Sequence, residues 1–131
     1  MSDPKAVLDT NILVSALLSP SGNPAQVFRK FLTGTLDLAY SKDILVEYED
    51  VLYRPRLRIP ANDVETALAA VRRFGEVVVP VPSTGAMIDG DDRVFYDTAK
   101  TAGAYLITGN AKHYPQEAFI LTPAEFLGLQ E

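Results

Sequence analysis

The chain has 131 residues and a net charge of −5, from 12 basic and 17 acidic side chains, and 47% of its residues are hydrophobic. This composition is typical of a folded globular protein, its acidity argues against a DNA-packaging protein, and the absence of cysteine excludes disulfides, zinc thiolates and thiol catalysis. No apolar run reaches the length of a bilayer and the start does not resemble a signal peptide, so we expect a single cytoplasmic domain over residues 1–131, not bound to a membrane.

Short apolar runs alternate with segments of helical periodicity along the whole chain. In chain order, the sequence predicts a strand over 5–9, an apolar segment over 12–18, a helix over 25–32, a strand over 36–40, helices over 41–54 and 63–74, a β-rich run over 76–81, a helix over 92–102, strands over 104–108 and 119–121, and a short terminal helix. This alternation indicates an α/β fold, a three-layer α/β/α sandwich around a mainly parallel sheet.

Local signals mark several helix ends. Asn23 is expected to cap the helix over 25–32, with Pro24 in its first turn. Ser41 is expected to cap the helix over 41–54, and Gly75 closes the helix over 63–74. The Thr-x-x-Glu sequence at 122–125 predicts a capping box that opens the terminal helix.

Polar residues follow the predicted strands, at the sheet edge where ligands bind in parallel α/β folds. Asp9 ends the first strand, and for an isolated acid the preferred interpretation is that it caps the helix beginning near Asn11. Glu47 falls at the rim of an apolar helical stripe, where an ordinary surface role is the alternative. Thr108 and Asn110 follow the strand over 104–108.

The sequence DGDDRVFYDTAK, residues 89–100, places four aspartates within nine positions: Asp89, Asp91, Asp92 and Asp97. Exposed amides and the helix dipole favour acids at a helix N-terminus, which accounts for one or two of the first three. Asp97 lies mid-helix, and we expect it to face water or the outer edge of a site.

The carboxylates after different strands can converge at one end of the sheet. Because carboxylates held close together repel, a hard divalent cation would stabilise them. Oxygen ligands without cysteine or paired histidine favour Mg²⁺ or Mn²⁺ over zinc. His113 is expected to be an ordinary surface or loop residue.

The chain resembles PIN domains, particularly the VapC-like toxins of bacterial and archaeal toxin–antitoxin pairs. The resemblance rests on VLDTNILVSALLS (7–19), EYEDVL (47–52), DGDDRVFYDTAKTAGAYLITGN (89–110) and KHYP (112–115), and it covers essentially the whole chain in order. It implies an Mg²⁺- or Mn²⁺-dependent endoribonuclease whose products carry 5′-phosphate and 3′-hydroxyl ends. It also implies an RNA substrate, a cognate antitoxin and a homodimer as partners.

The resemblance implies that Asp9, Glu47 and Asp92 are the catalytic, metal-binding acids. A fourth acid of many relatives is Asn110 here, and because an amide carries no charge, the number of metal ions stays open. The resemblance also assigns Asn11 and Thr108 as supporting residues. Asp89 and Asp97 are reserve candidates near the pocket.

Two other catalytic or signalling classes are excluded. A haloacid-dehalogenase-type phosphatase needs Asp-x-Asp after the first strand, where this chain has Asp9-Thr10-Asn11, and a phospho-receiver needs paired acids before that point. A PIN-like domain that binds RNA or protein without catalysis stays open. The arginines around Pro55 have two open interpretations, phosphate contact and ordinary helix-dipole partners.

Overall fold

The computed structural model describes residues 3–83 and 90–129. Short strands alternate with helices in the order that the sequence pattern predicts. The elements are β1 (Lys5–Leu8), α1 (Thr10–Leu18), α2 (Asn23–Leu32), β2 (Asp37–Tyr40), α3 (Lys42–Leu52), η1 (Pro55–Leu57), α4 (Ala61–Phe74), β3 (Glu76–Val77), α5 (Gly90–Ala102), β4 (Tyr105–Ile107), η2 (Ala111–His113), β5 (Ile120–Leu121) and α6 (Pro123–Leu129).

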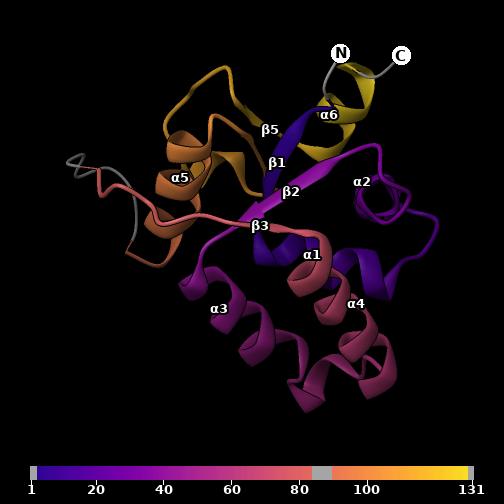
Figure 1. Cartoon of the computed structure of the whole chain (residues 1–131). Helices are drawn as coiled ribbons and strands as arrows, with labels where there is room; N and C mark the ends of the chain where they lie inside the picture. Colours follow the sequence, from indigo (N-terminus) through magenta and orange to yellow (C-terminus); the bar gives the residue numbers. More distant parts are fainter. Residues whose placement is uncertain (1–2, 84–89, 130–131) are drawn as a thin grey trace.

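The strands form one sheet in the order β3-β2-β1-β4-β5, and each pairing in the described part of the chain is parallel (Figure 1). Leu8 lies opposite Ile107, so β1 and β4 end side by side at the centre of the sheet. The N–H of Asp9 extends this ladder by donating to the carbonyl of Ile107 at 3.0 Å. The residues that follow these two strands therefore start from neighbouring points, and the α/β prediction is confirmed.

Six α-helices of the described chain flank the sheet (Figure 1). Helix α5 packs against β1, β2 and β4, whereas α1 packs against α2 and α3. None of the helices in residues 3–83 and 90–129 combines the length and apolar character needed to cross a membrane.

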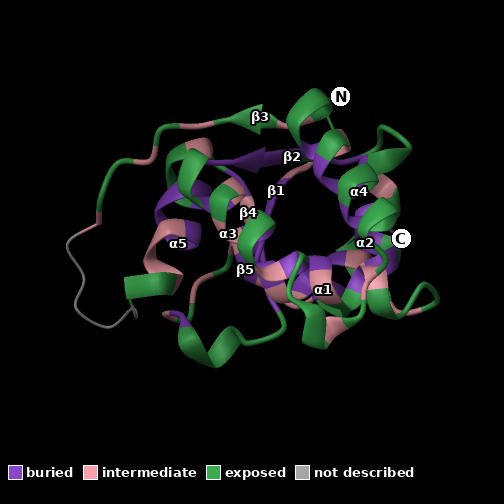
Figure 2. Ribbon diagram, turned by 90° about the horizontal axis from the view of Figure 1, so that it is seen from below, coloured by how far each residue is buried: buried purple, intermediate pink, exposed green. Residues whose placement is uncertain are grey.

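Buried residues concentrate on the central strands and on the inner sides of the helices (Figure 2). In β1, Ala6, Val7 and Leu8 have no exposed surface, and in β4, Leu106 and Ile107 have none. Because helices cover a parallel sheet, such strands are continuous apolar runs rather than alternating ones. The strand β3 at the sheet edge has exposed side chains.

The capping predictions are partly confirmed. The Ser41 side chain accepts a hydrogen bond of 3.2 Å from the N–H of Ile44, as expected of a cap. Thr122 and Glu125 form the reciprocal capping box, with bonds of 2.9 and 3.2 Å. The prediction for Asn23 is wrong, because the carbonyl of the preceding glycine accepts the first bond of α2 and Asn23 is already helical.

The region around β3 also differs from the prediction. Only two residues of the run 76–81 form a strand, since the chain leaves β2 after Val78 and Pro80 has no N–H for a ladder. Gly75 ends α4 as expected. A Cβ at Gly75 would lie 2.5 Å from the carbonyl oxygen of Val71 and 2.9 Å from the Tyr40 ring, so this close approach needs glycine.

Candidate functional site

Asp9 lies at the carboxyl edge of the sheet, directly after β1, and is 8% exposed. It occupies the N-cap position of α1, yet its side chain makes no capping hydrogen bond. Its Oδ2 instead accepts hydrogen bonds from the Thr108 hydroxyl at 2.8 Å and from the Tyr114 hydroxyl at 3.1 Å. The capping interpretation of Asp9 is therefore wrong, and two hydroxyl donors fix this carboxylate from the far end of the chain.

Tyr114 is a site residue to which the sequence analysis assigned no role. It follows η2 and is buried beneath the site. Burial raises the pKa of the Tyr114 hydroxyl, and the negative charges of Asp9 and Asp92 raise it further. The hydroxyl therefore keeps its proton and remains a donor to Asp9. The sequence offered only the motif KHYP as a signal, since a tyrosine in a loop has no distinctive spacing.

Glu47 is half-buried on α3, at the rim of the apolar stripe, as the helical periodicity predicts. The next residue, Tyr48, is completely buried and donates from its hydroxyl to the carbonyl of Leu8 at 2.5 Å. This bond joins α3 to the end of β1. It therefore places Glu47 beside the residues that follow β1, and the Thr10 hydroxyl donates a hydrogen bond to its Oε2.

The electrostatics of Glu47 show that several acids share this edge. Burial raises the pKa of Glu47 above its usual value, and the Thr10 hydroxyl acts in the opposite direction. The negative charges of three further acids add to the rise: Asp9, Asp91 and Asp92. Acids from β1, α3 and the start of α5 thus belong to one electrostatic neighbourhood, although they are far apart in sequence.

Asp92 is the third residue of α5 and half-buried, while Asp91 is exposed. Oδ2 of Asp92 lies 3.6 Å from Nδ1 of His113, which forms an ion pair only when the imidazole carries a proton. His113 itself is exposed, as expected for a loop histidine, but it borders the acids and is not isolated from them.

The supporting polar residues form the frame around Asp9. Oδ1 of Asn11 accepts a hydrogen bond of 3.3 Å from the N–H of Gly109, which ties α1 to the loop after β4. The N–H of Asn110 donates to the Thr108 hydroxyl at 3.0 Å. Thr108 thus bridges Asn110 and Asp9, and the segment after β4 is attached at two points, Thr108 to Asp9 and Gly109 to Asn11.

The two reserve candidates are Asp97, on α5, and Asp89. Asp97 was expected to face water or the outer edge of a site, and the first alternative is wrong because the residue is 6% exposed. Its Oδ1 accepts a hydrogen bond of 3.2 Å from the N–H of Ser83, so it anchors the chain after β3. Asp97 lies on the inner side of α5 with Phe95 and Thr98, where the helix packs on the sheet. Asp89 lies outside the described residues.

The donor chemistry of the edge fits a hard divalent cation, because the converging groups are carboxylate oxygens. Oδ1 of Asp9 accepts no hydrogen bond within the described residues, since both of its hydroxyl donors bind Oδ2. In residues 3–83 and 90–129, however, no three acidic or histidine side chains are already gathered as a metal-binding group. The donors are thus appropriate, and their side chains would have to rotate to meet on one ion.

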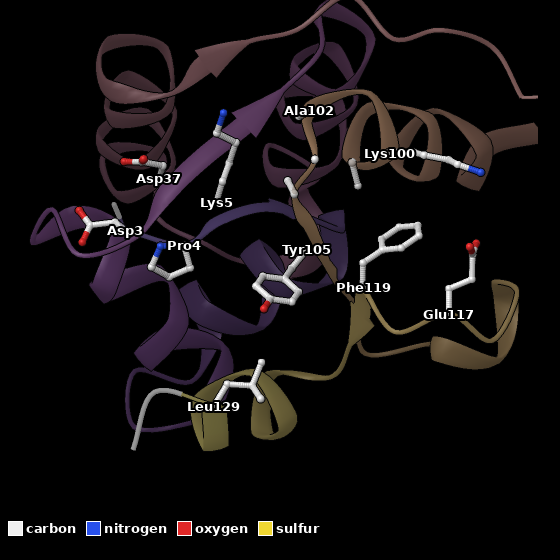
Figure 3. A pocket seen from close by; sticks show the side chains of 13 residues that line it. Asp3, Pro4, Lys5, Asp37, Lys100, Ala102, Tyr105, Glu117, Phe119 and Leu129 are labelled. Carbon is white, nitrogen blue, oxygen red and sulfur yellow. The ribbon is translucent and has the colours of Figure 1, made fainter. Parts of the chain in front are cut away.

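A separate hollow lies at the opposite end of the sheet (Figure 3). Lys5, Asp37 and Tyr105, from the starts of β1, β2 and β4, line it together with Lys100 and Glu117. Because these strands run parallel, the acids after their carboxyl ends lie at the other edge. This hollow is therefore not part of the candidate site.

The chain is similar to known proteins in sequence and in fold. Residues 5–112 match the sequence profile described as PIN domain. The uncharacterized protein MJ1680 of Methanocaldococcus jannaschii is 30% identical over 109 residues, which cover 81% of this chain and 70% of that protein. The crystal structure of VapBC2 from Rickettsia felis, bound to a DNA fragment from its promoter, is similar in fold, with a TM-score of 0.53 and 18% identity. That match covers 82% of this chain and 89% of the other.

Proposed function

Because the chain belongs to the PIN domain family, we propose that it is a metal-dependent endoribonuclease and the toxin of a toxin–antitoxin pair. PIN domains are typically nucleases that use divalent metals. One observation carries the proposal: carboxylates from three distant segments share the sheet edge, where burial raises the pKa of Glu47 and the charges of Asp9, Asp91 and Asp92 raise it further. The proposal assigns the activity to residues 1–131 as a single domain.

In this proposal Asp9, Glu47 and Asp92 would hold Mg²⁺ or Mn²⁺ through their carboxylate oxygens. A bound ion of this kind supplies hydroxide near neutral pH and offsets negative charge on a phosphodiester. The neighbouring hydroxyls orient the acids. Thr108 and Tyr114 occupy Oδ2 of Asp9 and leave Oδ1 for the ion, which removes a rotational choice before binding.

The Thr10 hydroxyl has the corresponding role for Glu47, because it donates to Oε2 and favours the charged carboxylate. Asn11 and Asn110 hold the loop after β4 in place around the acids. Asn110 supplies an uncharged amide where the resemblance to PIN domains implies a fourth acid, and the proposal needs only one ion, held by Asp9, Glu47 and Asp92.

A second candidate is a PIN-like domain that binds RNA or protein without cleaving it. Two observations favour it: Asn110 adds no charge, and the acids in the described residues do not form a ready metal-binding group. Metal titration separates the candidates. Calorimetric binding of Mn²⁺ that is lost in Glu47→Gln supports the nuclease, whereas RNA binding that is indifferent to metal supports the binding module.

We also propose a cognate antitoxin and a second copy of the chain as partners. Exposed apolar side chains occur on α1 and α2, where Leu18 is 48% and Leu32 is 53% exposed, and on α3, where Val46 is 57% exposed. Apolar surface of this kind is suited to protein contacts. Light scattering of the purified chain, with and without a co-expressed antitoxin, tests both assignments.

The direct test of the proposed activity is cleavage of end-labelled single-stranded and structured RNAs. The protein should cut RNA with Mg²⁺ or Mn²⁺ and stop when a chelator is added. Cleavage that continues in chelator would contradict the proposal.

A further inference from the structure

A groove lies directly beside the acids at the carboxyl edge of the sheet. Its walls come from the starts of α1, α2 and α6 and from the loop after β4. It shares Asn11 with the helix that begins next to Asp9, and Asn110 with the loop fixed by Thr108. A polymer whose backbone crossed the acids would therefore place an adjoining unit in this groove.

The chemistry of the groove differs from that of the acids. None of its described lining residues is charged, although the chain carries a net charge of −5. Five of them bring amide or hydroxyl side chains: Asn11, Ser15, Asn23, Thr122 and Asn110. Such groups both donate and accept hydrogen bonds. They suit the edges of a base and a ribose hydroxyl, whereas a phosphate would be met by cationic side chains.

The groove is also held in shape and is of suitable size. Asn11 is fixed through its Oδ1 to the N–H of Gly109, which leaves its amide NH₂ as a donor. Thr122 is fixed by the capping box, in which its hydroxyl oxygen accepts from the N–H of Glu125. The volume of about 450 Å³ lies within the range of roughly 300–1,000 Å³ that is usual for small-ligand sites.

We propose that this groove binds one nucleotide of single-stranded RNA, next to the phosphodiester at the acids, through its base edge and its 2′-hydroxyl. The inference rests on the proposed function, since it takes RNA as the substrate. An uncharged groove lets the strand approach an acidic edge without added repulsion. The 2′-hydroxyl is the group that distinguishes RNA from DNA.

The test is binding of a fluorescein-labelled single-stranded RNA octamer in chelator, measured by anisotropy, with the DNA octamer of the same sequence alongside. Ser15→Tyr fills the groove from an exposed position on α1, and Asn23→Ala removes one amide. Ala69→Tyr adds the same ring to an exposed position on α4 and serves as the matched control.

We expect Ser15→Tyr to weaken RNA binding by at least about tenfold and to lose the preference for RNA over DNA. Ala69→Tyr should bind as the wild type does. RNA binding that is unchanged in a folded Ser15→Tyr, checked by thermal melting, would overturn the proposal. If Ser15→Tyr does not fold, Asn23→Ala decides, and affinity equal to that of the wild type would overturn the proposal.

Cleavage by the same preparations with Mg²⁺ separates this inference from the proposed function. If the wild type cleaves RNA and Ser15→Tyr binds RNA as tightly as the wild type, the groove is not an RNA site and the nuclease proposal stands. Groove-dependent binding without any cleavage retains the groove as an RNA site and removes the nuclease.

Discussion

The hydroxyl of Tyr114 lies 3.1 Å from Oδ2 of Asp9, although 105 residues separate them in the chain. The Thr108 hydroxyl binds the same oxygen, so Oδ2 accepts two hydrogen bonds, whereas Oδ1 has no hydroxyl partner in the described residues. In the proposed function, this division would leave Oδ1 of Asp9 for a cation.

Tyr114→Phe removes one of these two donors and keeps the aromatic packing. We expect it to lower the free energy of unfolding by about 1.5–3 kcal/mol, because the lost hydrogen bond is to a charged group. We also expect weaker Mn²⁺ binding, measured by calorimetry. Tyr105→Phe is the control. It removes a tyrosine hydroxyl at the start of β4, away from the acids that follow the strand ends, and should leave Mn²⁺ affinity unchanged. Equal Mn²⁺ affinity in both variants would remove Tyr114 from the site.

The raised pKa of Glu47 gives metal-free stability a defined pH dependence. Below the usual glutamate pKa, both the folded and the unfolded chain carry the proton. As the pH rises towards the higher folded pKa, the unfolded chain releases its proton first, so the free energy of unfolding falls and then stays low. Glu47→Gln should abolish this decline and raise the melting temperature at neutral pH. Denaturant unfolding over a pH series measures it.

Glu49→Gln is the matched control for this experiment, since Glu49 lies on the exposed side of the same helix. It should keep the decline of the wild type. Addition of Mg²⁺ should stabilise the wild type most at neutral pH, where the half-buried Glu47 carboxylate would otherwise carry its charge beside other acids without a cation. A wild-type stability that does not change over this pH range would contradict the shared electrostatic neighbourhood of the acids.

Asp97→Ala tests whether the buried aspartate of α5 is structural. It leaves the N–H of Ser83 without its acceptor, so we expect a loss of about 1–3 kcal/mol in the free energy of unfolding. Mn²⁺ affinity should stay within about twofold of the wild type. Thr101→Val removes the neighbouring exposed acceptor for the N–H of Val81 and should cost less. A folded Asp97→Ala that no longer binds Mn²⁺ would return Asp97 to the site.

Asn110→Asp adds a carboxylate at the position where the resemblance to PIN domains implies a fourth acid. The extra charge should tighten Mn²⁺ binding roughly threefold to tenfold. It should also reduce metal-free stability, because the new anion lies near Asp9. Asn62→Asp makes the same change on α4, far from the acids in sequence, and should do neither. If Asn110→Asp and Asn62→Asp behave alike in Mn²⁺ titrations, residue 110 lies outside the ion's reach.

Much of this fold could be predicted from local sequence signals. The order of strands and helices followed from apolar periodicity, and the caps at Ser41 and Thr122 followed from side chains that bond within three residues. The match of residues 5–112 to the PIN domain profile confirms the family inferred from VLDTN and LITGN. Signals of this kind succeed because they act over a few residues of chain.

Less of the site could be predicted from the sequence, because its contacts join residues that are far apart in the chain. Nothing in the sequence pairs Tyr114 with Asp9, and no periodicity shows that Thr10 would bind Glu47. Asp97 was expected to face water or the outer edge of a site from its position in the middle of a helix, and no local signal shows that its carboxylate accepts from the N–H of Ser83. Such pairings depend on how the elements meet in three dimensions.

The proposed function places Asp9 in a metal-dependent ribonuclease site. Asp9→Asn tests it most directly, because an asparagine Oδ1 can still accept from Thr108 and Tyr114 while the charge is lost. End-labelled RNA should be incubated with each protein, purified identically, in Mg²⁺, in Mn²⁺ and in chelator. We expect metal-dependent cleavage by the wild type and none by a folded Asp9→Asn. Equal cleavage by the two proteins, or none by the wild type under any of these conditions, would contradict it.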